Sequence, residues 1–141
     1  TSDFHSNIEN IWDKIQDVNT LREICKPKAS FIACDDSPIQ WKEGKTFVFK
    51  MYLHGFLPVG RHTINVVKMD KTSREIDTKE YDNTVVIWNH YIKMEEISQQ
   101  VTRYIDTVDL YAGCLTSIAA WWTLKFYKHR QRKWQKIAKS L

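Results

Sequence analysis

The C-terminal segment from Gly113 to Leu141 reads GCLTSIAAWWTLKFYKHRQRKWQKIAKSL, with no glycine or proline after its first residue. Apolar residues recur in it at steps of three and four, the spacing of one face of an α-helix; they are Leu115, Ile118, Ala119, Trp122 and Phe126. Basic residues follow the same spacing on another face, namely Lys125, Lys128, Arg132, Lys136 and Lys139. The segment therefore predicts one long amphipathic helix, and its aromatic face requires a large surface to pack against.

The residues before this helix have the alternating pattern of β-strands and could supply that surface. Strands are expected over six segments, which are 29–34, 46–53, 61–69, 74–81, 85–96 and 101–111, with a loop over 35–38. Short links between strands favour antiparallel neighbours, so the sheet is predicted to be an antiparallel meander. Both faces of segment 46–53 are apolar, and we take the parity of Phe49 and Met51 as the inward one.

Two short helices are expected near the N-terminus. Ser6 and Glu9 form a capping-box pattern, which predicts a helix from about residue 7 to residue 16. A second helix from about residue 20 should end at Lys26, because Pro27 disfavours helical geometry in the residue before it. Residues 4–6 are interpreted as the remnant of a short first strand, which leaves the closure of that sheet edge open.

The predicted order of elements defines an α+β fold: a strand, two short helices, six strands and a long helix. A curved antiparallel sheet with one polar face must cover its other face, and only the C-terminal helix is long enough to do so. We therefore predict a helix-grip fold, in which a curved antiparallel sheet of six to seven strands wraps around the long helix. One domain over residues 1–141 is expected, with a cavity between sheet and helix.

Composition and charge exclude several classes of protein. No apolar run approaches the roughly 20 residues that a membrane-spanning helix needs. The three cysteines form no CxxC pair and the histidines lack metal-binding spacing, so we expect no disulfide framework, no metal, no cofactor and a cytoplasmic location. Residues 115–141 hold seven Lys and Arg and no acids, against fourteen bases and seventeen acids before them. This basic face is either a solvated helix surface or a site for nucleic acid or anionic lipid.

Several short motifs, taken in order, resemble one superfamily over essentially the whole chain. They are Ile11-Trp12, the segment GFLPVG at 55–60, Trp88-Asn89-His90, the segment TRYIDTV at 102–108 and the segment FYKHRQRKW at 126–134. In this order and spacing the chain resembles the birch-pollen-allergen/START superfamily of ligand-binding and polyketide-cyclase-like domains. The resemblance implies a hydrophobic cavity between sheet and helix, in a superfamily of lipid transporters, hormone receptors and cyclases.

His90 and Asp106 are the most informative polar pair. If the hairpin between their strands turns about Ser98, His90 lies directly opposite Asp106. Both share the parity of apolar neighbours such as Trp88 and Tyr104, so both should face inward, close enough for contact between imidazole and carboxylate. The pair could pin the strand register, anchor a ligand or act as a general acid and base.

A second candidate feature is the segment Gly55, Phe56, Leu57 and Pro58, which places apolar residues beside a glycine. By chain order it falls where the plant-hormone-receptor members of the superfamily carry their gate loop. The resemblance therefore implies a hinged apolar lid over the mouth of the cavity. The alternative is a rigid turn in which Phe56 packs on its neighbours.

These features predict the binding of a small hydrophobic or amphipathic ligand, such as a lipid, a polyketide-like molecule or another aromatic or isoprenoid compound. The expected wall residues are Phe49, Met51, Trp88, Tyr104, Trp122 and Phe126, with His90 and Asp106 as polar anchors. Two alternatives stay open: a cyclase- or hydratase-type enzyme using His90 and Asp106, or a basic-helix module for anionic membrane or nucleic acid. We favour a binding protein without catalytic residues or nucleic-acid partner, a monomer or weak dimer, and leave peripheral membrane contact open.

Overall fold

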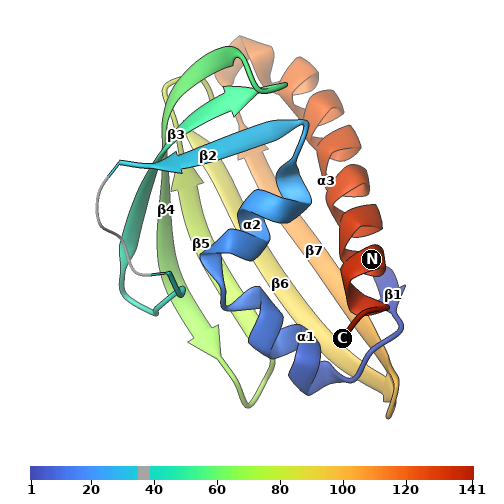
Figure 1. Cartoon of the computed structure of the whole chain (residues 1–141). Helices are drawn as coiled ribbons and strands as arrows, with labels where there is room; N and C mark the ends of the chain where they lie inside the picture. Colours follow the sequence, from blue (N-terminus) through green and yellow to red (C-terminus); the bar gives the residue numbers. More distant parts are fainter. Residues whose placement is uncertain (35–38) are drawn as a thin grey trace.

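The computed structural model describes residues 1–34 and 39–141, so the loop predicted over 35–38 lies outside the described residues. A seven-stranded antiparallel sheet in the order β1-β7-β6-β5-β4-β3-β2 curves around the helices (Figure 1). The strands are β1 (Ser2–Phe4), β2 (Ala29–Ala33), β3 (Thr46–Leu53), β4 (Leu57–Asp70), β5 (Glu75–Tyr81), β6 (Ile87–Ser98) and β7 (Val101–Tyr111). The helices are α1 (Ile8–Ile15), α2 (Val18–Cys25), the 3-10 turn η1 (Gly113–Leu115) and α3 (Thr116–Ala138). The predicted helix-grip arrangement is confirmed.

The helices all lie on the concave face of the sheet, and the core forms between the two layers (Figure 1). Buried residues alternate along the central strands, because successive side chains of a strand point to opposite faces. On β6 the buried residues are Trp88, His90, Ile92 and Met94. On β3 they are Phe47, Phe49 and Met51, so the inward parity predicted for this strand is confirmed.

The sheet edge whose closure was left open is covered by β1. This strand lies at Ser2–Phe4, slightly before the predicted remnant at 4–6, and pairs antiparallel with β7. Phe4 is fully buried and its ring stacks on Tyr104 with the centroids 5.0 Å apart. Three residues therefore suffice to complete the sheet, because the last of them anchors the strand in the core.

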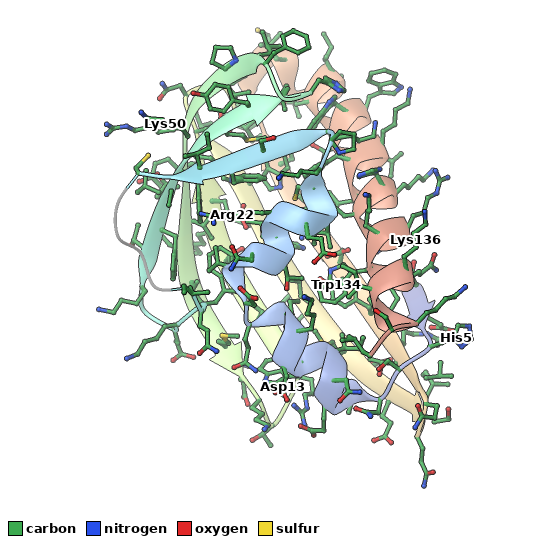
Figure 2. The ribbon with its side chains drawn as sticks, in the orientation of Figure 1. His5, Asp13, Arg22, Lys50, Trp134 and Lys136 are labelled. Carbon is green, nitrogen blue, oxygen red and sulfur yellow. The ribbon has the colours of Figure 1, made fainter. Side chains whose placement is uncertain are left out.

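The helix α3 packs on the sheet through a different face from the one predicted. Its buried residues are Thr123, Phe126, Tyr127, Arg130, Trp134 and Ala138. The inward face is thus rotated about the helix axis towards Arg130 and Trp134, and Leu115 and Ile118 are exposed. The predicted basic face does face solvent: in Figure 2 Lys136 points away from the molecule, whereas Trp134 lies on the inner side of α3.

The first two helices begin one or two residues away from the predicted positions. Asn7, rather than Ser6, caps α1, because its side chain accepts a hydrogen bond from the backbone N–H of Asn10 at 2.9 Å. Asp17 caps α2 in the same way through the N–H of Asn19. No helix among the described residues is long and apolar enough to cross a membrane.

Candidate functional site

A cavity of about 70 Å³ lies between the concave face of the sheet and the helices. Most of its lining is apolar or aromatic and comes from all layers of the fold, including Ile24 of α2, Met51 of β3, Ile76 of β5, Trp88 of β6 and Phe126 of α3. Polar side chains reach the same space from two sides. The sheet contributes His62, Thr78, Glu80 and His90, and α3 contributes Arg130.

His90 and Asp106 are in contact, although the predicted register between their strands is wrong by two residues. His90 Nε2 lies 2.7 Å from Asp106 Oδ1, yet His90 is paired with Val108 and Asp106 with Ile92. The hairpin turns over Gln99 and Gln100, and a bulge interrupts the pairing between Glu96 and Ser98. A shift of two residues leaves both side chains on the same face, so the pair meets diagonally instead of directly across.

Both carboxylate oxygens of Asp106 have a donor. Oδ1 faces His90, and Oδ2 accepts a hydrogen bond from Gln131 Nε2 at 2.9 Å. Gln131 is held in turn by the hydroxyl of Ser2, which donates to its Oε1 at 2.6 Å. Burial by itself raises the pKa of Asp106, but the hydrogen bond and charge of His90, the more distant charge of Arg130 and the hydrogen bond from Gln131 hold that pKa below its ordinary value. Asp106 therefore stays ionised, behind His90 rather than in the cavity wall.

A second histidine cluster, absent from the predicted site, joins β4, β5 and the segment that follows β5. His62 Nε2 lies 2.9 Å from Glu80 Oε2, and His62 Nδ1 lies 3.2 Å from Asp82 Oδ2. Asp82 also accepts hydrogen bonds from the backbone N–H groups of Thr84 and Val85. The sequence does contain a signal for this cluster. His62 shares the parity of the apolar Ile64, and Glu80 and Asp82 share that of Ile76.

This second cluster is held in its charged form. Burial by itself lowers the pKa of His62, but the hydrogen bonds to Asp82 and Glu80 raise it to about 9. Burial raises the pKa values of Glu80 and Asp82, and the contacts with His62 reverse that effect, so that both lie below their ordinary values. An imidazolium between two carboxylates is therefore the stable arrangement at neutral pH.

The two histidine clusters meet at β5. The hydroxyl of Thr78 donates to Glu80 Oε1 at 2.6 Å, and His90 Nδ1 lies 4.0 Å from that same oxygen. The two clusters thus adjoin each other on the sheet, but 4.0 Å is too long for a hydrogen bond between them. In the part of the chain that the structure describes, no group of three or more His, Cys, Asp or Glu side chains is arranged to hold a metal ion.

Arg130 of α3 has no such partners. It is buried, lines the cavity and stacks on the ring of Tyr127, with 4.6 Å between the guanidinium carbon and the ring centroid. Across residues 1–34 and 39–141 its guanidinium forms no ion pair, and its Nε atom has no hydrogen-bond partner. Sequence reasoning missed this residue because it was grouped with the other bases of a basic segment. Its spacing of four from both Phe126 and Trp134 places it on the inward face.

The predicted wall residues divide into two groups. Met51, Trp88, His90 and Phe126 line the cavity. The others pack next to it: Phe49 against Phe31, Tyr104 between Phe4 and Trp134, and Trp122, which is half-buried, on Phe126 with centroids 4.8 Å apart. The cavity is also bounded by α1 and α2, through Ile15, Leu21 and Ile24, which were not among the predicted wall residues.

The segment predicted as a gate loop is a tight turn between β3 and β4. His54 and Gly55 form the turn with positive φ angles of 51° and 82°, and Leu57 and Pro58 already belong to β4. Phe56 is 78% exposed, so the alternative in which it packs on its neighbours is wrong. A lid function for this turn stays a prediction.

Comparisons with known proteins agree on the fold. No protein-family model and no curated protein matches the chain. Among solved structures, protein CV1439 from Chromobacterium violaceum matches with a TM-score of 0.72 and 8% identity, over 97% of this chain and 92% of that one. Protein Ms6760 from Mycobacterium smegmatis gives 0.69 and 11%, over 99% and 88%, and a conserved protein from Geobacillus kaustophilus gives 0.64 and 12%, over 99% and 92%. At such identities the likeness shows the shared fold alone.

Proposed function

We propose that this chain binds a small apolar or amphipathic molecule in the cavity between the sheet and α3, as a ligand-binding member of the birch-pollen-allergen/START superfamily. The observation that carries the proposal is the composition of the cavity wall. Most of the wall is apolar or aromatic, and a few buried polar side chains converge on it, which is the usual make-up of a small-molecule site.

The size of the cavity limits the ligand. Its volume of about 70 Å³ is about half that of an engineered apolar cavity of roughly 150 Å³ that admits benzene. A ligand group of a few atoms fits without rearrangement, and a larger body requires wall side chains to move. We therefore expect a small molecule, or a longer one of which only one end enters this space.

Native mass spectrometry of the purified protein, before and after lipid extraction, tests the proposal. The additional mass of a co-purified ligand should disappear on extraction. It should also be absent from Ile76→Phe, since Ile76 lines the cavity and a larger side chain fills it. Val67→Phe is the matched control, because Val67 lies on neighbouring β4 and is 47% exposed. The proposal is contradicted if both variants retain the same ligand mass. It is also contradicted if the wild-type protein retains no ligand mass and does not bind added straight-chain alcohols.

The histidine contacts bear on the enzyme alternative. Both ring nitrogens of His62 are hydrogen-bonded to carboxylates, so neither is available as a general acid or base. On His90, Nε2 faces Asp106 at 2.7 Å, whereas Nδ1 lies 4.0 Å from Glu80 Oε1, too far for a hydrogen bond. These contacts support a structural role for His62, and the cyclase or hydratase alternative would rest on His90.

Peripheral membrane contact is a second candidate, favoured by exposed apolar residues at one end of the sheet. The β3–β4 turn and the start of α3 lie at this end, at the top of Figure 1, and expose Phe56, Ile118 and Trp121. Lys125 lies over the Trp121 ring at 3.7 Å, so one cation adjoins the apolar surface.

Co-sedimentation with anionic vesicles tests the membrane candidate. Binding should fall steeply with added salt if the basic face contributes, because charged contacts at a lipid surface are screened. The combined change of Lys128, Arg132 and Lys136 to Gln should remove this salt-dependent part. No binding at low salt would contradict the membrane candidate.

A further inference from the structure

We propose that the ligand of this cavity carries a carboxylate group, and that Arg130 binds it. This inference rests on the proposed function and names the chemical class of the ligand. It adds a binding residue that the sequence motifs did not indicate.

The first observation is the position of Arg130. It is 7% exposed, its side chain lines the cavity, and its guanidinium is stacked on Tyr127 and lies 5.8 Å from the Phe126 ring centroid. Removing a charged side chain from water is unfavourable unless an opposite charge or hydrogen-bond acceptors replace the water. Stacking on aromatic rings compensates in part, but it leaves the in-plane N–H donors of the guanidinium unused.

The second observation is that the neighbouring carboxylates are engaged elsewhere. Asp106 accepts from His90 and Gln131, Glu80 accepts from His62 and Thr78, and Asp82 faces His62 and two backbone N–H groups. None of them forms an ion pair with Arg130 within the described residues. Within residues 1–34 and 39–141 the guanidinium thus has no carboxylate partner, which leaves its donors available to a ligand or to water.

The chemistry of the guanidinium selects the acceptor. Its planar fork of N–H donors matches the two oxygens of a carboxylate, and such charge-assisted pairs are stronger than bonds to a neutral oxygen. The apolar side chains opposite, such as Ile24, Ile76 and Ile92, suit a hydrocarbon body. The charge of His62 neutralises part of the charge of Glu80 and Asp82, which lessens the repulsion of an incoming anion by this wall. Together these features describe a small carboxylic acid with an apolar chain or ring.

Isothermal titration with straight-chain carboxylates from acetate to octanoate, beside the alcohols of the same chain lengths, tests this assignment. The best carboxylate should bind the wild-type protein at least about tenfold more tightly than its alcohol, as expected for one charge-assisted hydrogen-bonded pair. Arg130→Met keeps the length and apolar stem of the side chain and removes the charge. It should abolish the preference for the acid, because the charge that distinguishes the acid from the alcohol is gone.

Two further variants complete the test. Arg132→Met, on the exposed face of the same helix, should behave as wild type. Arg130→Lys, which keeps the charge but not the fork, should retain only part of the preference. Thermal unfolding of each variant confirms that it is folded.

The outcomes separate the two proposals. If alcohols bind and the acids bind no better, or if Arg130→Met preserves the preference for the acid, the carboxylate assignment is wrong and ligand binding in the cavity stands. If Arg132→Met removes the preference as completely as Arg130→Met, the acid binds on the surface and the assignment is also wrong. If neither acids nor alcohols bind, both proposals fail.

Discussion

The two sides of the cavity treat their buried polar groups in different ways. On the sheet side, His62 and His90 are each hydrogen-bonded to their own carboxylates, and Asp106 also accepts from Gln131 of α3. On the helix side, Arg130 is buried against aromatic rings, and its Nε has no partner in the described part of the chain. Buried charge is therefore not by itself a sign of function. Satisfied charges stabilise one arrangement of the fold, whereas an unsatisfied one facing a cavity points to a ligand.

The largest loss of stability is expected at Trp134, which holds α3 on the sheet through packing. Trp134 is 1% exposed and its ring packs against Phe4 and Tyr104. Trp134→Ala should lower the free energy of unfolding by about 3–5 kcal/mol, because it deletes a large aromatic side chain from the core. Chemical denaturation measures this change. Trp121→Ala is the control, since Trp121 is 59% exposed on the same helix, and equal losses in the two variants would contradict the orientation of α3.

A smaller loss of stability is expected on the sheet side from Asp106→Asn. The change leaves His90 without its carboxylate, and a buried group that loses its partner typically costs about 1–3 kcal/mol. Because Asp106 lies behind His90, ligand affinity should change little. Denaturation and titration with the best-binding carboxylate measure the two quantities, with Asp109→Asn on the outer face of β7 as the control. A large loss of affinity without a loss of stability would make Asp106 a ligand anchor instead.

The His62 cluster should make stability depend on pH. The folded protein keeps the His62 proton up to a pKa of about 9, whereas the unfolded chain releases it near 6.5, so the unfolded state binds fewer protons between these values. Stability should therefore be fully present below about pH 6.5 and fall as the pH rises to about 9. Glu80 and Asp82 act in the opposite direction, and their contribution is lost as the pH falls into the acid range.

Denaturant midpoints across this pH range test the His62 prediction. His62→Gln should flatten the decline above pH 6.5, and His5→Gln, at an exposed position, should leave it unchanged. If stability declines with pH as steeply in His62→Gln as in the wild type, a group other than His62 causes the decline.

The smallest effect on stability is expected from Arg130→Met. A buried charge without a partner contributes little to the folded state, and an apolar side chain of similar length removes its desolvation penalty. The free energy of unfolding should stay within about 1 kcal/mol of the wild-type value or rise. A loss as large as that of Asp106→Asn would show that Arg130 is a satisfied structural charge and would remove the contrast between the two sides.

The sequence predicted the fold well because strand periodicity survives small errors of register. The contact of His90 with Asp106 was found despite a shift of two residues, since such a shift preserves which face each side chain occupies. The bulge after Glu96 could not be read from the alternation, because it adds one residue to one strand without changing the pattern on the other.

The face of α3 that packs on the sheet was harder to predict. Apolar residues at 115 and 118 fit a helical stripe, but which side of the helix meets the sheet depends on packing with distant strands. Arg130 was missed for the same reason: its type suggested the surface, and only its spacing from Phe126 and Trp134 placed it inside. At position 130 the residue type predicted an exposed side chain and the helical spacing predicted a buried one, and the spacing was right.

The central claim, that a small molecule occupies the cavity, is tested most directly by the indole N–H signals in nitrogen-15 NMR spectra during a titration with the same acids and alcohols. Trp88 Nε1 donates to the hydroxyl of Tyr127, and Trp134 Nε1 is buried without a partner among the described residues. Both side chains line the cavity, so both signals should shift and saturate as ligand is added, while the signal of exposed Trp121 stays in place. Titrations in which Trp88 and Trp134 do not respond, or in which only Trp121 does, would contradict the claim.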